Sequence, residues 1–248
     1  METTETPAAD VIVRLEGITK AYRGVPAVRN IDFDLRQGEI HALLGENGAG
    51  KSTLTKIMAG AVEPSAGRIV HHGREVRFSS PNEALDAGIA MVFQETSLVP
   101  SMTVAQNLYL GSEKFLNRLR GIYISAQQFL QSLNFPVDPA AMVETLGAAK
   151  RQMVEIARAV HHNAEVIIFD EPTATLTPEE KRHFFALMRR LKASGVSIVF
   201  ISHALEEALL VSDRITVLRD GELVASGPVA DFDRASIIAA MVGRTLSG

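Results

Sequence analysis

The sequence predicts an α/β fold with a mostly parallel central sheet, extended by an antiparallel β subdomain and an inserted helical subdomain. Three observations support this. A glycine-rich segment at residues 45–50 lies between an apolar run and a helical stripe. The runs Val166–Phe169 and Val196–Phe200 are almost continuously apolar, which is typical of strands buried on both faces. Between residues 100 and 162, strand patterns give way to helical periods.

Length, charge and cysteine usage limit the functional classes. The 248 residues suffice for one large α/β domain or for a core with an inserted subdomain. The net charge of −4 and the lack of a long basic run argue against nucleic acid as the main partner. No cysteine is available for a disulfide or a thiolate metal site. Residues 1–10 are polar and acidic, and no apolar run approaches the ~20 residues of a membrane span. We therefore expect a flexible N-terminal tail and a cytosolic protein.

Three predicted strands come first. Val11–Leu15 has the composition of a strand, and Ile31–Leu35 alternates between apolar and polar residues, as half-exposed antiparallel strands do. Glu39–Leu44 is apolar enough for a buried strand. Tyr22 lies between the first two strands. Its ring could stack on a nucleotide base, or it could be an ordinary packing residue near a strand end.

The glycine-rich segment matches the phosphate-binding P-loop pattern, G-x-x-x-x-G-K-[ST], and so predicts a P-loop NTPase core. Glycines let such a loop turn tightly and direct its N–H groups to one point, and the following helix adds the positive end of its dipole. Lys51 would contact the β- and γ-phosphates, and the Ser52 hydroxyl could bind Mg²⁺. The predicted phosphate-binding residues are Gly45, Glu46, Asn47, Gly48, Ala49, Gly50, Lys51, Ser52 and Thr53.

The middle of the chain predicts a hairpin, a strand and several helices. Arg68–Val70 and Glu75–Phe78 pair across a glycine, and Pro81–Ala87 forms a short helix after a serine cap. Ile89–Phe93 is a buried strand that places Gln94 at its end. Helical periods follow at Val104–Leu108, Ala126–Leu133 and Met153–Val160.

The last third of the chain alternates strands and helices. The strand at 166–169 places Asp170 and Glu171 at its C-terminal end, and the strand at 196–200 leads to His203. In α/β sheets this is the edge where ligands bind. The other predicted elements are a helix at Pro178–Lys192 with Thr177 as N-cap, a hairpin of Ile215–Leu218 and Glu222–Val224 across Asp220-Gly221, and a helix at Ala235–Met241.

The side chains at these strand ends suit phosphoryl transfer, which depends on positioning and charge neutralisation. Asp170 is expected to hold Mg²⁺, and Glu171 to orient an attacking water or accept its proton. His203 could bond to the γ-phosphate or to this water; the alternative is a structural histidine.

Two histidine pairs, His71-His72 and His161-His162, are a weak hint of metal binding. Adjacent residues are expected to point apart on a strand or helix. We therefore assign no site to either pair.

Together these residues resemble the nucleotide-binding domain of an ATP-binding-cassette (ABC) transporter, over nearly the whole chain. The resemblance implies that Tyr22 stacks on adenine, that residues 45–53 form Walker A, and that Gln94 is the Q-loop glutamine, which contacts Mg²⁺ or water. It also implies that Asp170 is the Walker B aspartate, Glu171 the catalytic glutamate and His203 the switch histidine, with ATP and Mg²⁺ as ligands. Residues 11–95 and 164–248 would form the catalytic core and residues 96–163 the helical subdomain.

Two positions depart from the family pattern. The signature Leu-Ser-Gly-Gly-Gln reads here Leu146-Gly147-Ala148-Ala149-Lys150. In the family this segment closes over ATP held by the other domain of a pair, and Gly147 lacks the hydroxyl that reaches the γ-phosphate. Ala148 and Ala149 replace glycine-type positions and restrict close approach. The second departure is Thr177, where the D-loop usually ends in Asp.

Thr177 and the segment 152–159 are similar to the carbohydrate-importer branch, in which many proteins carry two cassettes. The resemblance implies ATP-driven import of a sugar, at the inner face of the cell membrane. The expected partners are a second cassette (a fused half or a second copy), transmembrane permease subunits and, indirectly, a periplasmic sugar-binding protein. With the altered signature, we expect one ATP site of a two-cassette protein to hydrolyse and the other mainly to hold nucleotide. The alternatives are a regulatory cassette of little turnover and a non-transport cassette ATPase.

Overall fold

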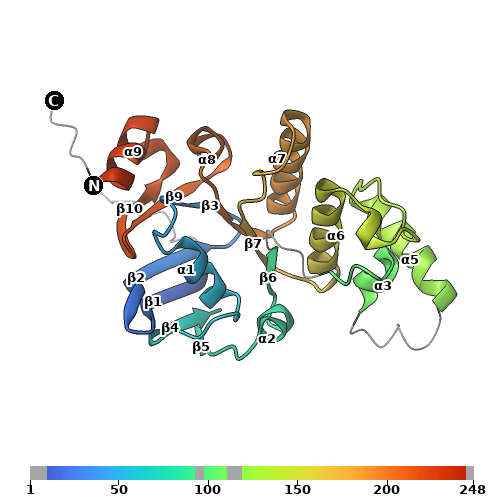
Figure 1. The fold of residues 1–248 in the computed structure, drawn as a ribbon, viewed down its shortest axis with the longest axis horizontal. Helices are drawn as coiled ribbons and strands as arrows, with labels where there is room; N and C mark the ends of the chain where they lie inside the picture. The colour runs from blue at the N-terminus through green and yellow to red at the C-terminus, as the bar shows by residue number, and fades with distance from the viewer. Residues whose placement is uncertain (1–9, 93–97, 111–118, 244–248) are drawn as a thin grey trace, which may run out of the picture.

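The computed structural model describes residues 10–92, 98–110 and 119–243. Within these ranges the chain forms a six-stranded sheet in the order β10-β9-β3-β8-β7-β6 (Figure 1). All neighbouring pairs run parallel except β9 and β10, which form a hairpin. The strands are β3 (Ile40–Leu44), β6 (Ile89–Val92), β7 (Val166–Asp170), β8 (Ser197–Ile201), β9 (Arg214–Arg219) and β10 (Glu222–Pro228).

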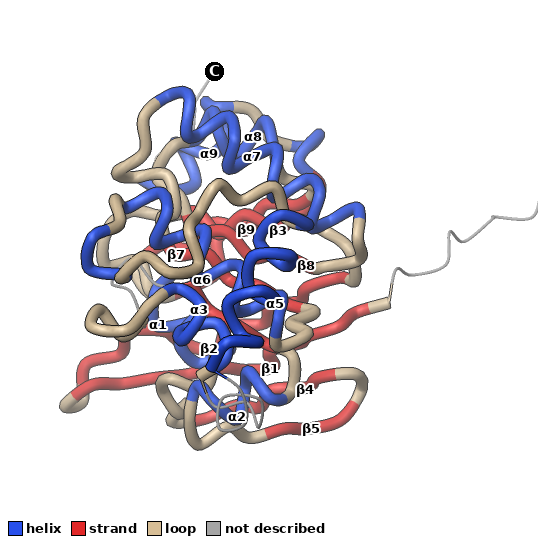
Figure 2. The backbone as a smooth tube through the Cα atoms, turned by 90° about the vertical axis from the view of Figure 1, so that its right-hand side faces the viewer, coloured by secondary structure: helices blue, strands red, loops and turns tan. Residues whose placement is uncertain are grey.

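A second sheet of four antiparallel strands, in the order β2-β1-β4-β5, lies beside the first. Helix α1 (Lys51–Met58) packs between the two sheets, and its residues Leu54, Ile57 and Met58 are buried in a shared core. Figures 1 and 2 show α7, α8 and α9 above the parallel sheet and the antiparallel strands below it. The strands of the second sheet are β1 (Val11–Tyr22), β2 (Val25–Arg36), β4 (Ala66–His71) and β5 (Arg74–Val76).

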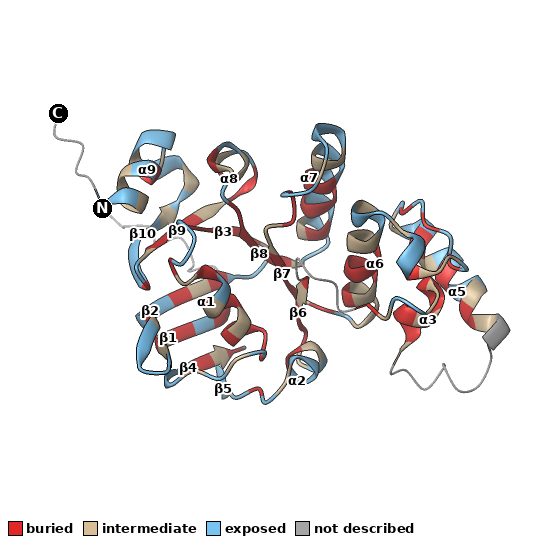
Figure 3. Cartoon of the chain, viewed as in Figure 1, coloured by how far each residue is buried: buried red, intermediate tan, exposed pale blue. Residues whose placement is uncertain are grey.

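The other helices, apart from α8, lie where the sequence predicted helices. The described helices are α2 (Pro81–Asp86), α3 (Val104–Tyr109), α5 (Leu119–Ser132), α6 (Ala148–His161), α7 (Pro178–Ala193), α8 (Leu205–Val211) and α9 (Arg234–Val242), with 3₁₀ turns at Val143–Thr145 and Val229–Asp231. Helices α3, α5 and α6 gather at one end of the molecule, and Figure 3 shows their inner faces buried and their outer faces exposed. None of the helices in the described ranges combines the length and apolar character that crossing a bilayer requires.

The sequence-based fold class is confirmed: the protein is α/β, with a mostly parallel sheet and an antiparallel second sheet. The predicted hairpins β4–β5 and β9–β10 are present. Thr177 caps α7 as expected, accepting a hydrogen bond from the Glu180 N–H at 3.2 Å and donating its own N–H to the Glu180 carboxylate at 2.8 Å. This reciprocal capping box, followed by Pro178, fixes the start of α7.

Several expectations differ from the structure. Strands β1 and β2 extend well beyond the predicted runs, and α8 was not predicted. The expectation that His71 and His72 point apart is wrong, because their ring centroids lie 4.4 Å apart. His72 has a left-handed backbone (φ 49°) in the turn after β4, which ends the alternation of side chains. The expected tail, apart from Asp10, and Gln94 lie outside the described residues.

Candidate functional site

The phosphate loop connects the buried strand β3 to α1, as predicted. Gly50 forms the N-cap of α1 with φ 104°. A Cβ at this position would lie 2.7 Å from Val28 Cγ1 and 2.8 Å from the carbonyl oxygen of Ala27, so the backbone angle and the available space both require glycine. The cap offers no side-chain acceptor to the first N–H groups of α1, and the first turn contains no acidic residue. The helix start is therefore available to an anion.

Lys51 is buried, and its ammonium lies over its own loop. Nζ donates hydrogen bonds to the carbonyl oxygens of Gly45 at 2.5 Å and Glu46 at 2.9 Å. Burial lowers the pKa of Lys51, and the charges of Glu171 and Asp170 partly oppose this effect. The lysine thus lies within electrostatic reach of both acids predicted from the sequence.

Asp170 ends β7, paired with Ile201 of β8. Burial raises the pKa of this carboxyl, and the neighbouring Glu171 raises it further. Lys56 and Lys51 of α1 lower it, which places the end of β7 beside this helix. Two oxygen donors therefore come from neighbouring elements, the Ser52 hydroxyl on α1 and the Asp170 carboxylate. Hard oxygen ligands of this kind fit Mg²⁺.

Glu171 has a left-handed backbone, with φ 48°. Its N–H donates to the carbonyl oxygen of Ile201 at 3.1 Å, which holds the turn in place. Its Oε1 lies 2.6 Å from Nε2 of His203, which follows β8. The structure therefore brings together two residues that the sequence placed only on the same sheet edge. Residues held in such sparsely populated backbone conformations cluster at functional sites.

Tyr22 ends β1 opposite Val25, and the residue is 46% exposed. The Lys20 ammonium lies 5.4 Å from the ring centroid. The β1–β2 hairpin that carries Tyr22 also reaches the phosphate loop, because Ala27 and Val28 contact Gly50. The exposed ring is thus available for stacking.

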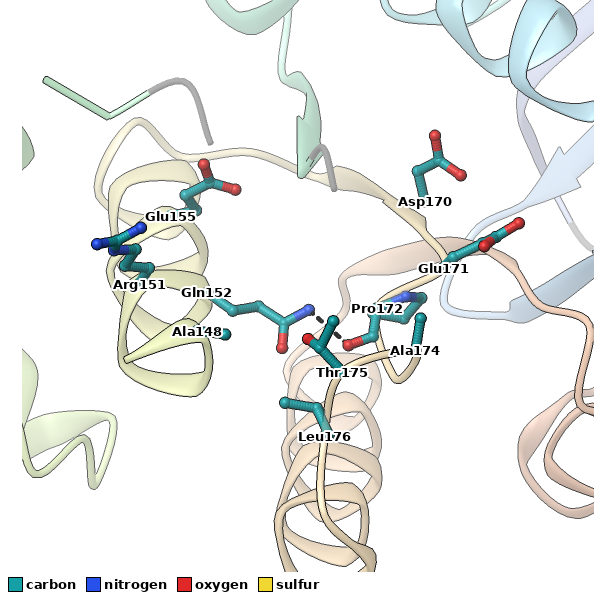
Figure 4. Close-up of a pocket in the computed structure, with 10 residues that line it drawn as sticks. All are labelled: Ala148, Arg151, Gln152, Glu155, Asp170, Glu171, Pro172, Ala174, Thr175 and Leu176. Carbon is teal, nitrogen blue, oxygen red and sulfur yellow. Dashed lines mark hydrogen bonds between the residues drawn. The ribbon is translucent and has the colours of Figure 1, made fainter. Parts of the chain in front are cut away.

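The signature segment begins α6. Gly147 is its exposed N-cap, and no side chain in the described part of the chain caps it. From there α6 borders a cleft of about 170 Å³ whose other wall follows β7. Figure 4 shows the carboxylates of Asp170 and Glu171 directed away from α6. The lining residues are Ala148, Arg151, Gln152, Glu155, Asp170, Glu171, Pro172, Ala174, Thr175 and Leu176.

Three features of this region were missed from the sequence. The Gln152 side chain donates a hydrogen bond to the Pro172 carbonyl oxygen at 3.1 Å and ties α6 to the loop after β7 (Figure 4). Glu207 of α8 accepts hydrogen bonds from Thr173 at 2.8 Å and Lys181 at 2.9 Å. Lys56 is a second cation near Asp170. Of these three features, only the position of Lys56 could have been predicted, because it lies one helical turn after Ser52 and therefore on the same face of the helix.

Comparisons with known proteins identify the family of this chain. The family model described as ABC transporter matches residues 28–174. The chain is 48% identical over 238 residues to the ribose import ATP-binding protein RbsA 1 of Rubrobacter xylanophilus, covering 95% of this chain and 48% of that protein. It is 46% identical over 242 residues to RbsA 1 of Streptomyces avermitilis, covering 96% of this chain and 46% of that protein. The chain thus spans about half the length of the curated relatives it matches.

Solved structures show the same fold. A nucleotide-free ATP-binding cassette from an ABC transporter has a TM-score of 0.80 at 24% identity and covers 95% of this chain and 96% of its own. The cassette MJ1267 of an ABC transporter has a TM-score of 0.81 at 26% identity and covers 93% of this chain and 98% of its own. With the family model matched over more than half of its residues, the chain belongs to the ABC transporter family.

Proposed function

We propose that this chain binds MgATP and hydrolyses it, with Lys51, Asp170, Glu171 and His203 as the central residues. The observation that carries the proposal is the convergence of these groups at the uncapped start of α1. The ammonium of Lys51 interacts electrostatically with the carboxylates of Glu171 and Asp170. The Glu171 carboxylate also lies 2.6 Å from Nε2 of His203. Phosphoryl transfer requires groups that position the phosphates and neutralise their charge. Here these groups are a lysine, a helix start without a side-chain cap and a glutamate paired with a histidine.

Each residue takes a distinct part. The first N–H groups of α1 would bind the phosphates, and Lys51 would exchange the carbonyl oxygens of Gly45 and Glu46 for phosphate oxygens. Ser52 and Asp170 would hold Mg²⁺, which supplies neutralisation of phosphate charge when bound. Glu171 would orient the attacking water or accept its proton, with His203 holding the carboxylate in position. Tyr22 would stack on the base, and Gln94 remains a proposed contact to Mg²⁺ or water.

We propose further that the chain powers sugar import, because relatives at 46–48% identity are named ribose import ATP-binding proteins. It would act at the inner face of the membrane with permease subunits and a second cassette, and indirectly with a periplasmic binding protein. In this arrangement residues 11–95 and 164–248 form the catalytic core, and residues 96–163 form the helical subdomain. Relatives about twice as long favour a fused second cassette over a second copy.

The altered signature supports asymmetry between the two sites. Gly147 has no hydroxyl to offer to a partner's nucleotide, and Ala148 and Ala149 add methyl groups at the start of α6. The site on this chain's own P-loop keeps its residues and would hydrolyse ATP when a partner supplies an intact signature. The site that this signature serves would mainly hold ATP. The same observation favours a second candidate function, a regulatory cassette of little turnover.

The deciding experiment measures Mg²⁺-dependent ATP hydrolysis against the concentration of this chain, with ATP binding followed by calorimetry. The proposal predicts ATP binding that Lys51→Ala abolishes, and turnover that stays low until a cassette with an intact signature is added. Specific activity that rises with the concentration of the chain alone would refute the asymmetric model. Absence of turnover with an intact partner would favour the regulatory cassette, and failure to associate with permease subunits would favour a non-transport ATPase.

A further inference from the structure

A cluster of three metal-ligating side chains lies far from the nucleotide site. His71 ends β4, His72 begins the turn to β5, and Glu165 directly precedes β7. Asp170 is at the other end of β7, five residues after Glu165, so the cluster lies about 16 Å from it along the strand, at 3.3 Å per residue. The nucleotide chemistry makes no use of these groups.

The three side chains converge on one point. Nε2 of His71 lies 3.1 Å and Nε2 of His72 lies 2.5 Å from the same oxygen, Oε1 of Glu165. One ligand atom from each residue falls within 4.8 Å of the others. Ligands at about 2.0–2.1 Å from a tetrahedral ion are about 3.3 Å apart. Small side-chain movements would therefore make room for an ion between them.

The backbone fixes the three residues independently of one another. His71 is buried and pairs with Val13 of β1, and the His72 N–H donates to the carbonyl oxygen of Ile12 at 3.0 Å. The Glu165 N–H donates to the carbonyl oxygen of Gly88 at 2.9 Å. A Cβ at Gly88 would lie 2.9 Å from Glu165 Cγ, so the glycine leaves space for this side chain. Ligands held by two separate sheets form a preorganised site.

The cluster is accessible from solvent, and its ligand atoms favour one class of metal ion. The side chains of His72 and Glu165 are 54% and 38% exposed, which leaves a path from solvent and a position for water. Two imidazole nitrogens and one carboxylate oxygen suit Zn²⁺ and similar first-row ions, whereas Mg²⁺ prefers oxygen ligands alone. An ion here would therefore not compete with the magnesium proposed for the nucleotide.

We propose that His71, His72 and Glu165 bind a divalent transition-metal ion of the Zn²⁺ type, which links the β4–β5 hairpin to the start of β7. Such an ion joins the antiparallel sheet to the parallel sheet. It stabilises the folded chain, in which the ligands are assembled, relative to the unfolded chain, in which His71 and Glu165 are separated by 94 positions along the sequence.

The test is calorimetric titration of Zn²⁺ into the metal-free chain without a histidine tag, in the presence of millimolar Mg²⁺. We expect saturable one-to-one binding and a higher unfolding temperature with Zn²⁺. His72→Gln and Glu165→Gln should each weaken binding at least tenfold and remove most of this temperature shift. His183→Gln, which removes an exposed histidine on α7, is the matched control and should change neither.

His203→Gln is needed as a second control, because His203 and Glu171 could also attract Zn²⁺. No saturable binding by the original chain would overturn the proposal. So would binding that His203→Gln abolishes and His72→Gln leaves intact. Far-UV circular dichroism of each variant establishes that it folds, and His72 is exposed enough to be replaced without opening the core.

Discussion

At the residue scale, Glu171 combines a left-handed backbone with a short contact to His203. The conformation costs on the order of 1 kcal/mol for a residue with a Cβ. It is retained because Asp170 must face α1 while the next carboxylate faces His203, and regular β geometry would send the two side chains to opposite faces. The strain therefore places two adjacent acids on one site.

From this pairing we predict that Glu171→Gln lowers kcat at least 100-fold, because the amide cannot accept a proton from water. ATP binding, measured by calorimetry, should change less than threefold, since the phosphate loop is untouched. His203→Gln should also lower kcat, and the double variant should be little slower than Glu171→Gln, because the two residues act as a unit. Fully additive losses in the double variant would contradict this joint role.

Much of the site could be predicted at this scale, and the reason is covalent spacing. Lys51 and Ser52 follow Gly50 directly, and Asp170 and Glu171 follow an apolar run, so motif and strand pattern indicate their position. The left-handed angle of Glu171 and the bonds from Lys51 to the loop carbonyl oxygens depend on the packed structure. The convergence of His71 and His72 was missed because a turn residue obeys no periodicity.

At the element scale, α6 lacks the serine that would cap it. Gly147 has φ −69°, and an added Cβ would meet no atom of the described chain within 4 Å. A serine hydroxyl there could accept a hydrogen bond from the first turn of α6. The signature change therefore weakens the helix start slightly while removing a group that faces the solvent.

We predict that Gly147→Ser stabilises the chain by a few tenths of a kcal/mol, the usual advantage of serine over glycine at an N-cap. The comparison is Thr177→Ala, which should cost about 1 kcal/mol because it removes the capping box of α7. Urea unfolding midpoints of the two variants measure both effects. ATP binding to the chain's own phosphate loop should stay unchanged in Gly147→Ser. A lower unfolding midpoint for Gly147→Ser than for the original chain would contradict this prediction, because the structure leaves enough room for the serine side chain.

Some helices and strands could be predicted from the sequence more readily than others. The β9–β10 hairpin could be predicted because an Asp-Gly pair favours the two left-handed backbone angles of a tight turn. The structure shows both angles, at Asp220 and Gly221. Helix α8 was missed because it is only seven residues long and its buried positions, Leu205, Ala208 and Val211, show barely two turns of period. The long strands β1 and β2 were underpredicted because the residues at their tips do not alternate between apolar and polar and are held by pairing with each other.

At the scale of the whole molecule, the largely covered cation Arg214 joins the two sheets. Arg214 of β9 donates to both carboxylate oxygens of Asp34 on β2, at 2.9 and 3.0 Å. It also donates to Glu39, just before β3, at 3.1 Å. The phosphate loop follows β3, and α1 packs between the sheets, so this link helps to fix the two sheets on either side of the proposed nucleotide site.

We predict that Arg214→Met destabilises the chain by about 2–3 kcal/mol, less than a fully buried pair would lose, because Asp34 is partly exposed. The variant leaves the carboxylates of Asp34 and Glu39 without the cation that they share, and Arg36, 3.9 Å from Asp34, replaces it only in part. Asp34→Asn should cost less, because one hydrogen bond to the amide oxygen can persist and Glu39 still pairs with the arginine. Urea unfolding at neutral pH should rank the two variants in this order, and equal stability of Arg214→Met and the original chain would contradict the role of the link.

The same contact predicts a pH dependence with a definite sign. Burial alone would raise the pKa of Asp34, but the hydrogen bonds and charge of Arg214, with His41 and Arg36, outweigh burial and lower it below the ordinary 3.8. Because the folded chain then binds fewer protons than the unfolded chain, the stabilisation is present above the unfolded pKa and is lost as pH falls through the folded pKa. The difference in unfolding free energy between the original chain and Asp34→Asn should therefore be constant from pH 5 to 7 and shrink below about pH 4. A difference that grew on acidification would mean that Asp34 is stabilised by something other than the arginine.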